Sequence, residues 1–210
     1  MRIILLGAPG SGKGTLSNIL IEKKGYVQIS TGDLFREQVQ LGTELGKKVE
    51  SIMKAGEFVP VEITNKILEN KLAELKHNDN IIFDGYPRNI EQANYLSTLT
   101  NIDKVIEIQV SDDILLKRIV GRWTCPKCKK IFNIYSPDMK PAKEGICDAC
   151  GAQLTHRADD NKESFAKRME IFHKSTTPLI DYYKSKGLLV SIDGNGGSAD
   201  IITALTGILF

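Results

Sequence analysis

The sequence has no long apolar run and almost no net charge. No stretch approaches the roughly 18–20 consecutive apolar residues that a membrane-spanning helix needs. The apolar run after Met1 and Arg2 is interrupted by Gly7, so this part of the chain does not look like a secretory signal peptide. The 28 Lys and Arg residues nearly balance the 26 Asp and Glu residues, and a formal net charge of +2 excludes a strong overall field for nucleic acid or membranes. We therefore expect a cytoplasmic protein that binds neither.

Cysteine is scarce and occurs in a single window of the chain. Cys125 and Cys128 form one C-x2-C pair, Cys147 and Cys150 form a second, and eighteen residues separate the two pairs. In a cytosolic protein such clustering points to a metal rather than to disulfides, and this spacing is typical of a zinc ribbon. Four thiolates leave no coordination position open, so the predicted zinc is structural. The histidines lack a paired nucleophile or metal-ligand spacing, and we expect structural or surface roles for all three: His77, His156 and His173.

Short β-branched apolar runs alternate with helix-like segments along most of the chain. Because the runs barely alternate between apolar and polar residues, they are typical of buried strands in a parallel sheet. The predicted strands are Arg2–Leu6, Val27–Ser30, Asn80–Asp84, Lys104–Val110 and Leu188–Ile192. The predicted helices are Lys13–Lys23, Gly42–Ala55, Val61–Leu75, Ile90–Leu99, Ile114–Val120, Lys162–Lys186 with a bend near Pro178, and Ser198–Leu209 with Ser198 as its N-cap. This order predicts a three-layer α/β fold with helices on both faces of a central parallel sheet of five strands, and ligands beyond the carboxyl ends of the strands.

One segment, from about Arg122 to Asp160, breaks this rhythm. It holds the four cysteines, three prolines and no clear periodicity. We expect a small insert whose folding depends on the metal, because it has little apolar core of its own.

The stretch from Gly7 to Thr15 reads GAPGSGKGT and directly follows the first predicted strand. It matches the phosphate-binding pattern G-x-x-x-x-G-K-[ST] except that Gly14 stands at the hydroxyl position and Thr15 comes one residue late. A glycine-rich turn that opens a helix surrounds an anion with backbone N–H groups, and Lys13 adds a positive charge. The sequence thus predicts a P-loop, in which either Thr15 supplies the hydroxyl for magnesium or the metal is held in another way.

This loop resembles that of the nucleoside monophosphate kinases, and GAPGSGKGT is close to the adenylate kinase form. The resemblance covers nearly the whole chain through further stretches in family order: Ile29–Arg36 (ISTGDLFR), Phe83–Asn89 (FDGYPRN), Gly121-Arg122, and His156–Asp160 (HRADD) followed by Lys167-Arg168. The insert resembles the long zinc-containing lid of many bacterial adenylate kinases. The resemblance implies a monomeric enzyme that uses Mg²⁺ and reversibly transfers a phosphoryl group from ATP to AMP, giving two ADP.

The resemblance also implies which charged residues carry the reaction. Transfer onto a phosphate oxygen needs positioning and charge neutralisation rather than a strong base, and the planar fork of arginine binds phosphate oxygens in pairs. The implied catalytic residues are Lys13, Arg36, Arg88, Arg122, Arg157 and Arg168.

The remaining implied site residues divide between the two nucleotides. The ATP set is Gly10, Ser11, Gly12, Lys13, Gly14, Thr15, Arg122, Ile131, Phe132 and Gly196. The AMP set is Thr31, Arg36, Glu57, Phe58, Val59, Gly85, Tyr86, Pro87, Arg88, Gln92, Arg157 and Arg168. Gln92 is expected to read the adenine edge, and Asp84 to organise magnesium through water. For Asp159 and Asp160, a hinge contact, a contact with metal-bound water and a helix cap all stay open.

By the same resemblance the chain divides into three parts. Residues 1–29, 60–121 and 161–210 form the core P-loop domain, residues 30–59 the AMP-binding subdomain, and residues 122–160 the zinc-binding lid.

Two other functions remain as alternatives. A kinase for another nucleoside monophosphate would share the fold and mechanism, since base choice is the least constrained part of the inference. A zinc-ribbon protein that binds nucleic acid and uses ATP as a switch is conceivable from Lys127, Lys129 and Lys130, although the near-zero net charge speaks against it. A P-loop GTPase is disfavoured because the sequence has no guanine-reading NKxD motif.

Overall fold

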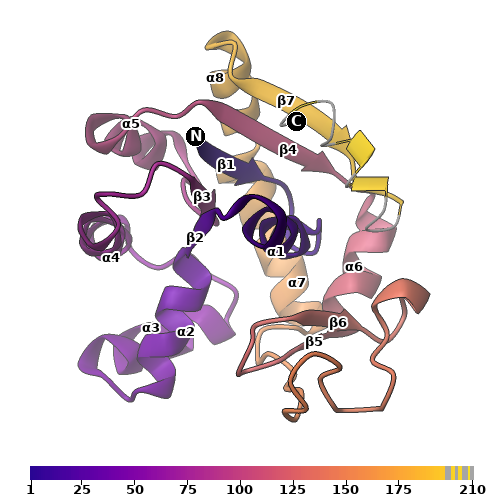
Figure 1. Cartoon of the computed structure of the whole chain (residues 1–210). Coiled ribbons are helices and arrows are strands. Elements are labelled where there is room, and N and C mark those ends of the chain that lie inside the picture. Colours follow the sequence, from indigo (N-terminus) through magenta and orange to yellow (C-terminus); the bar gives the residue numbers. More distant parts are fainter. Residues whose placement is uncertain (197–199, 202, 205–207, 209–210) are drawn as a thin grey trace.

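Five parallel strands form the centre of the molecule. The computed structural model of the chain describes residues 1–196, 200, 201, 203, 204 and 208. The strands of the central sheet are β1 (Arg2–Leu6), β2 (Val27–Ser30), β3 (Ile81–Asp84), β4 (Lys104–Gln109) and β7 (Leu189–Asp193). Their order is β2-β3-β1-β4-β7 and all neighbours run parallel, which confirms the predicted sheet (Figure 1).

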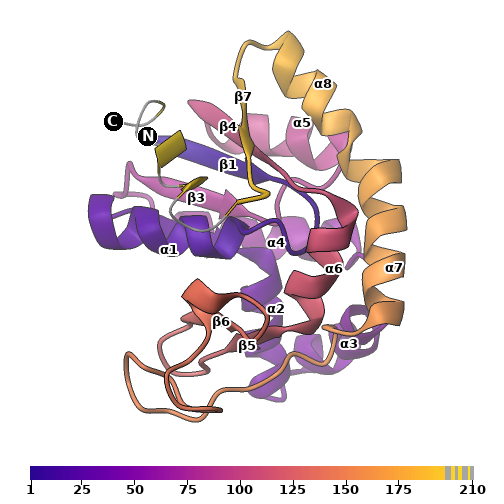
Figure 2. The same ribbon diagram turned by 90° about the vertical axis from the view of Figure 1, so that its right-hand side faces the viewer.

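Helices cover both faces of this sheet, as the α/β alternation predicts, and others form a unit of their own. The helices are α1 (Lys13–Lys24), α2 (Thr31–Gln40), α3 (Glu44–Lys54), α4 (Val61–Glu74), α5 (Ile90–Leu99), α6 (Asp112–Val120), α7 (Lys162–Ile171) and α8 (Pro178–Ser185). Figure 2 shows α1 on one side of the sheet and α8 on the other.

The two faces have separate apolar cores because successive side chains of a strand point to opposite sides. On β1, Ile3 and Leu5 pack in the cluster that contains α1, whereas Ile4 and Leu6 pack in the cluster that contains α4, α5 and α8. These four side chains are at most 3% exposed, and burying each one stabilises the fold by about 1.5–3 kcal/mol. The two cores fix the strands relative to one another, so that the carboxyl ends of the strands lie at one edge of the sheet.

Helix α2 was not among the predicted elements. It begins after Ser30, whose side chain accepts a hydrogen bond from the backbone N–H of Asp33 at 3.3 Å. The Ser-x-x-Asp spacing is an N-terminal capping signal that a closer inspection of the sequence could have detected. Helices α2 and α3 pack around Phe35, Val49 and Val59, so this unit has a small core of its own.

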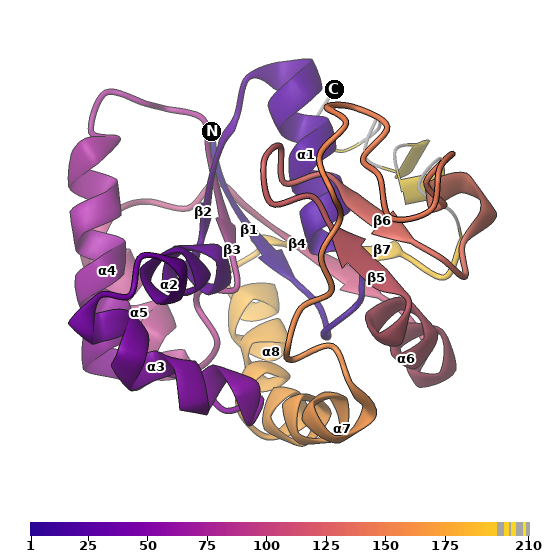
Figure 3. The same cartoon turned by 90° about the horizontal axis from the view of Figure 1, so that it is seen from below.

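Residues 122–160 form the predicted insert, which we call the cysteine insert. Its regular structure consists of the antiparallel strands β5 (Arg122–Thr124) and β6 (Ile131–Asn133) and the short 3-10 helix η1 (Pro137–Met139). Its core contains Phe132 and Leu154 beside the sulfur atoms of Cys125 and Cys147. Seen from below in Figure 3, the α2–α3 unit lies on one side of the molecule and the cysteine insert on the other.

The predicted bend in Lys162–Lys186 takes the form of a π-helical turn, η2 (Phe172–Thr176), between α7 and α8. The N–H of Thr177 donates to the carbonyl of Phe172 at 2.9 Å, and Pro178 follows with no N–H to continue the regular ladder. The helix predicted over Ser198–Leu209, with its N-cap Ser198, lies largely outside the described residues. Within the described part of the chain, no helix is long and apolar enough to cross a membrane.

Candidate active site

The loops beyond the carboxyl ends of the strands enclose a cavity of about 280 Å³. Its walls come from the glycine loop, the α2–α3 unit, the loop after β3, α7 and the cysteine insert. The cationic side chains that line it outnumber the carboxylates: Lys13, Arg36, Arg88, Arg118, Arg122, Lys129, Arg157 and Arg168 against Asp33, Glu57, Asp84, Asp138 and Asp159. Such a cavity favours a ligand with several negative charges.

The glycine loop forms the wall of the cavity at the start of α1. Gly7 has a φ of 150°, and a Cβ on it would lie 2.6 Å from the Oγ of Ser11 and 2.9 Å from the carbonyl oxygen of Ile108. A side chain therefore cannot be accommodated there. The Nζ of Lys13 donates to the carbonyls of Gly7 at 2.7 Å and Ala8 at 3.0 Å, which holds the ammonium inside the loop.

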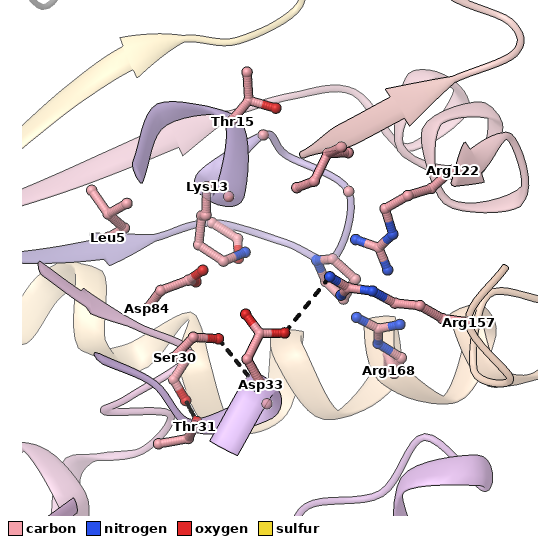
Figure 4. A pocket seen from close by; sticks show the side chains of 18 of the residues that line it. Leu5, Lys13, Thr15, Ser30, Thr31, Asp33, Asp84, Arg122, Arg157 and Arg168 are labelled. Atoms are coloured by element: carbon pink, nitrogen blue, oxygen red, sulfur yellow. Dashed lines mark hydrogen bonds and ion pairs between the residues drawn. The ribbon is translucent and has the colours of Figure 1, made fainter. Parts of the chain in front are cut away.

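Gly14, the departure from the usual motif, lies against the cysteine insert. A Cβ at this position would lie 2.7 Å from the Cδ1 of Ile131, which belongs to β6 of the cysteine insert. A Ser or Thr at position 14 would thus require Ile131 to move. The hydroxyl of Thr15 stands one residue later on α1, and Thr15 lines the cavity (Figure 4).

All five predicted arginines line this one cavity, although they come from five separate elements and loops. Figure 4 shows Arg122, Arg157 and Arg168 converging on the side opposite Lys13 and Asp84. Arg88 donates from its Nε to the carbonyl of Gly85 at 2.7 Å, and its guanidinium lies 4.9 Å from the ring centroid of Phe58.

Carboxylates hold the arginines of the insert and of α7 in place. Asp160 is fully buried and accepts two hydrogen bonds from Arg122, one of them from Nε to Oδ2 at 2.7 Å. Asp159 pairs with Arg168 at 3.0 Å. Across the cavity, Asp33 lies 3.8 Å from Arg157. Asp159 and Asp160 thus orient arginines at the two ends of the insert. Of the three roles left open, this one is nearest to the hinge contact, and the residue that caps α7 is Asn161.

Burial shapes the charge balance of the site. It lowers the pKa of Lys13 to about 8, although Asp84 opposes this effect. It also lowers the pKa of Arg157, which Arg122 and Arg36 lower further. Burial raises the pKa of Asp84, against the effect of Lys13. Buried cations crowded in this way would be stabilised by an anionic ligand.

The four cysteine sulfurs meet at one point in the insert. All four Sγ atoms lie within 4.8 Å of one another, with Cys125 and Cys150 at 3.4 Å and Cys128 and Cys147 at 3.5 Å. A tetrahedron with metal–sulfur bonds of about 2.3 Å has sulfur–sulfur edges of about 3.8 Å, so the group could hold a metal ion.

Comparisons with known proteins agree with these observations. The family model described as adenylate kinase matches residues 5–188. An adenylate kinase of Caldicellulosiruptor saccharolyticus is 46% identical over 206 residues, which cover 95% of this chain and 94% of the relative. Adenylate kinases of Thermodesulfovibrio yellowstonii and Listeria monocytogenes are 41% and 42% identical over 215 residues, covering 100% of this chain and 99% of theirs. The chain belongs to the adenylate kinase family.

Most residues that the adenylate kinase resemblance assigns to AMP line the cavity. They are Thr31, Arg36, Glu57, Phe58, Val59, Gly85, Pro87, Arg88, Gln92, Arg157 and Arg168. Tyr86 does not. Its ring is buried in the core, and its hydroxyl donates to the Oδ1 of Asn65 at 2.7 Å. Gln92 accepts from the backbone N–H of Arg88 at 2.7 Å, and the hydroxyl of Thr31 donates to the carbonyl of Gly85 at 2.9 Å.

The residues assigned to ATP are brought together in the same way, with two exceptions. Gly10, Gly12, Lys13, Gly14, Thr15, Arg122, Ile131 and Gly196 line the cavity. Ser11 is buried behind the loop, and the Phe132 ring lies in the core of the cysteine insert instead of lining the cavity.

Arg118 and Gln28 are two of the cavity residues that were not predicted from the sequence. Arg118 on α6 donates to the carbonyl of Gly196 at 2.8 Å, and its buried Nη1 has no partner among the described residues. No sequence signal marks Arg118, because Arg122 lies beyond the end of α6 and belongs to β5. Gln28 donates to Asp84 at 2.9 Å, and no sequence signal marks that contact.

Proposed function

We propose that the protein is a phosphotransferase that reversibly moves the γ-phosphoryl group of ATP to AMP, giving two ADP. The observation that carries this proposal is the convergence of Lys13 and five arginines on one cavity beside a glycine-rich loop. In this reaction the bond between the γ-phosphorus and the β-phosphate oxygen of ATP breaks, and a new bond forms to a phosphate oxygen of AMP. Both partners are anionic, so positioning and charge neutralisation supply most of the catalysis.

Each cation has a place in this scheme. The glycine loop and Lys13 bind the β- and γ-phosphates of ATP through backbone N–H groups and the buried ammonium. Arg36 and Arg88 hold the AMP phosphate, and the rigid contacts of Arg88 with Gly85 and Phe58 pre-orient its guanidinium. Arg122, Arg157 and Arg168 surround the transferring group and stabilise the charge spread over its oxygens.

The chain then works as three parts. Residues 1–29, 60–121 and 161–210 form the core, residues 30–59 bind AMP, and residues 122–160 act as a lid. The lid carries Arg122 and Arg157, so its closure both completes the site and excludes water that would otherwise hydrolyse ATP. The approach of Asp33 to Arg157 supports contact between the lid and the AMP-binding part.

The donor atoms of the site suit Mg²⁺, which neutralises phosphate charge when it is bound with ATP. Asp84 would hold it through water, and the hydrogen bond from Gln28 fixes the Asp84 carboxylate that faces the cavity. Thr15 offers the hydroxyl that Gly14 lacks.

We also propose that the lid metal is zinc in a structural role. Cys125, Cys128, Cys147 and Cys150 fit a closed tetrahedral site, in which the metal would stabilise the small core of the lid. The N–H of Cys128 points at the Sγ of Cys125 at 3.4 Å, a contact that favours the thiolate form.

For partners and compartment, we propose a cytoplasmic monomer whose ligands are ATP, AMP and ADP. The formal charge of +2 supports the absence of a nucleic-acid or membrane partner.

The acceptor base can be tested with ADP formation from Mg-ATP and AMP, GMP, CMP or UMP in turn. Among these four acceptors, we expect strong turnover only with AMP. Gln92→Glu is the informative variant because it keeps the acceptor oxygen for the Arg88 N–H but loses the amide donor. It should raise KM for AMP about tenfold or more while leaving KM for ATP unchanged. Turnover with another nucleotide would refute the proposed role of Gln92.

A further inference from the structure

The two C-x2-C turns of the cysteine insert share a left-handed residue directly after the second cysteine, but the residue type differs. In the second turn Gly151 follows Cys150, has a φ of 70°, and donates its N–H to the carbonyl of Cys147 at 2.9 Å. In the first turn Lys129 follows Cys128, has a φ of 62°, and donates its N–H to the carbonyl of Cys125 at 3.0 Å. Lys129 is the one residue other than glycine with a left-handed backbone in the described part of the chain.

The left-handed conformation is a requirement of the turn, since both copies adopt it. Glycine adopts it without steric penalty, whereas a side chain brings Cβ close to the following carbonyl oxygen. Lysine has no short polar side chain with which to form the local hydrogen bond that lets Asn or Asp tolerate this region. Strained residues that persist in this way are concentrated at functional sites, so the lysine side chain requires an explanation outside the turn.

The two residues differ in their surroundings, and this difference suggests a function for the lysine side chain. Lys129 is exposed yet lines the nucleotide cavity, together with Thr124 and Ile131 of the same hairpin, whereas Gly151 does not line it. Within the described residues, the ammonium of Lys129 forms no ion pair or hydrogen bond. Of the neighbouring lysines, Lys130 lies over the ring of Phe132 at 5.9 Å and Lys127 does not line the cavity.

The hairpin also places Lys129 near the donor end of the cavity. Ile131 reaches the first turn of α1, where its Cδ1 would meet a Cβ on Gly14. Thr15 and Asn18 of α1 also line the cavity. The hairpin that carries Lys129 therefore packs against the start of α1, beside the glycine loop that is expected to bind polyphosphate.

We propose that Lys129 is an additional binding residue for the triphosphate of the donor nucleotide, contributed by the lid in a strained backbone conformation. The inference rests on the proposed function, because it assigns the donor to the glycine-loop end of the cavity. It predicts an unusual combination for Lys129→Gly: a lid at least as stable as before and a weaker affinity for ATP.

The test is the dissociation constant of Mg-ATP, measured by titration calorimetry without AMP, together with thermal unfolding of the zinc-loaded protein. Lys129→Gly should raise the dissociation constant about threefold to fivefold, the range of a partly exposed ion pair. Its unfolding temperature should stay the same or rise. Lys129→Arg should keep the affinity, and raised salt should reduce the difference between wild type and Lys129→Gly.

Gly151→Lys is the matched control, since it introduces the same strain on the turn that does not line the cavity. It should lower the unfolding temperature and leave the affinity for Mg-ATP unchanged. An unchanged dissociation constant in Lys129→Gly, or an equal loss of affinity for AMP, would overturn the proposal. Because binding is measured without turnover, failure of the wild type to form ADP from AMP would count against the proposed function and not against Lys129.

Discussion

The contact between Asp160 and Arg122 offers the sharpest test of how the lid positions its arginines. Asp160→Asn keeps the shape of the side chain but replaces one acceptor oxygen with an NH2 group that faces a guanidinium. The carboxylate is fully buried, whereas Arg122 keeps 14% of its side chain exposed. Breaking a buried ion pair costs about 3–5 kcal/mol, and the partial exposure of Arg122 places this case near 3 kcal/mol.

Two consequences can be measured. At about 2–4 °C per kcal/mol for a chain of this size, the unfolding temperature should fall by about 6–12 °C. The released guanidinium no longer sits at the transferring group, and a displacement of about 1 Å can reduce kcat about 100-fold. Scanning calorimetry and a coupled assay of ADP formation measure the two effects on the same preparation.

Glu170→Gln is the matched control because it makes the same carboxylate-to-amide change in an exposed ion pair with Lys167. Exposed pairs contribute at most about 1 kcal/mol, so both readouts should stay close to those of the wild type. If Asp160→Asn behaved like this control, the reasoning about buried charge at the lid hinge would be refuted.

Three further perturbations test the cavity and the cysteine insert. Arg88→Ala should lower kcat/KM for AMP at least about 1000-fold, because it removes a cation that binds the phosphate. The unfolding temperature should not fall, since burial already disfavours the charged form of Arg88. Near-normal turnover would contradict the role of Arg88. Cys147→Ser should loosen the lid before the rest of the molecule, seen in calorimetry as a separate early transition with reduced zinc content, and one unchanged transition with full zinc would contradict this. The pKa of Lys13, lowered to about 8, predicts that kcat/KM for ATP declines above about pH 8 as the ammonium is lost, and Lys13→Arg should remove that decline. The lowered pKa of Lys13 affects the stability of the unliganded protein in the opposite direction. Between about pH 8 and 10.5 the folded state binds fewer protons than the unfolded state, so the contribution of Lys13 to the free energy of unfolding rises with pH.

The sheet, the glycine loop and the cysteine cluster could be predicted from the sequence because each has a local sequence pattern. Buried strands form continuous apolar runs, a phosphate loop requires glycines at fixed offsets, and a thiolate site requires paired cysteines. The turn at Pro178 was predicted as a bend, although its π-helical form depends on the contact of Thr177 with Phe172 and could not be derived from proline alone.

The partners of the charged residues could not be predicted in this way. Asp160 lies 38 residues from Arg122 in the chain, and Gln28 lies 56 residues from Asp84, so each pair exists only because the fold brings distant loops together. The contact of Gly14 with Ile131 of the insert is likewise tertiary. Phe132 illustrates the reverse case: the family resemblance assigned its position to ATP, whereas its ring lies in the small core of the cysteine insert.

The central claim is that the phosphoryl group passes from ATP to AMP and not to water. Phosphorus NMR of the protein with equal Mg-ATP and AMP tests it most directly, because ATP, ADP, AMP and inorganic phosphate give separate signals. The account predicts that ATP and AMP decline together as ADP appears, that ADP alone regenerates both, and that inorganic phosphate stays absent. Release of inorganic phosphate with AMP unchanged would contradict it.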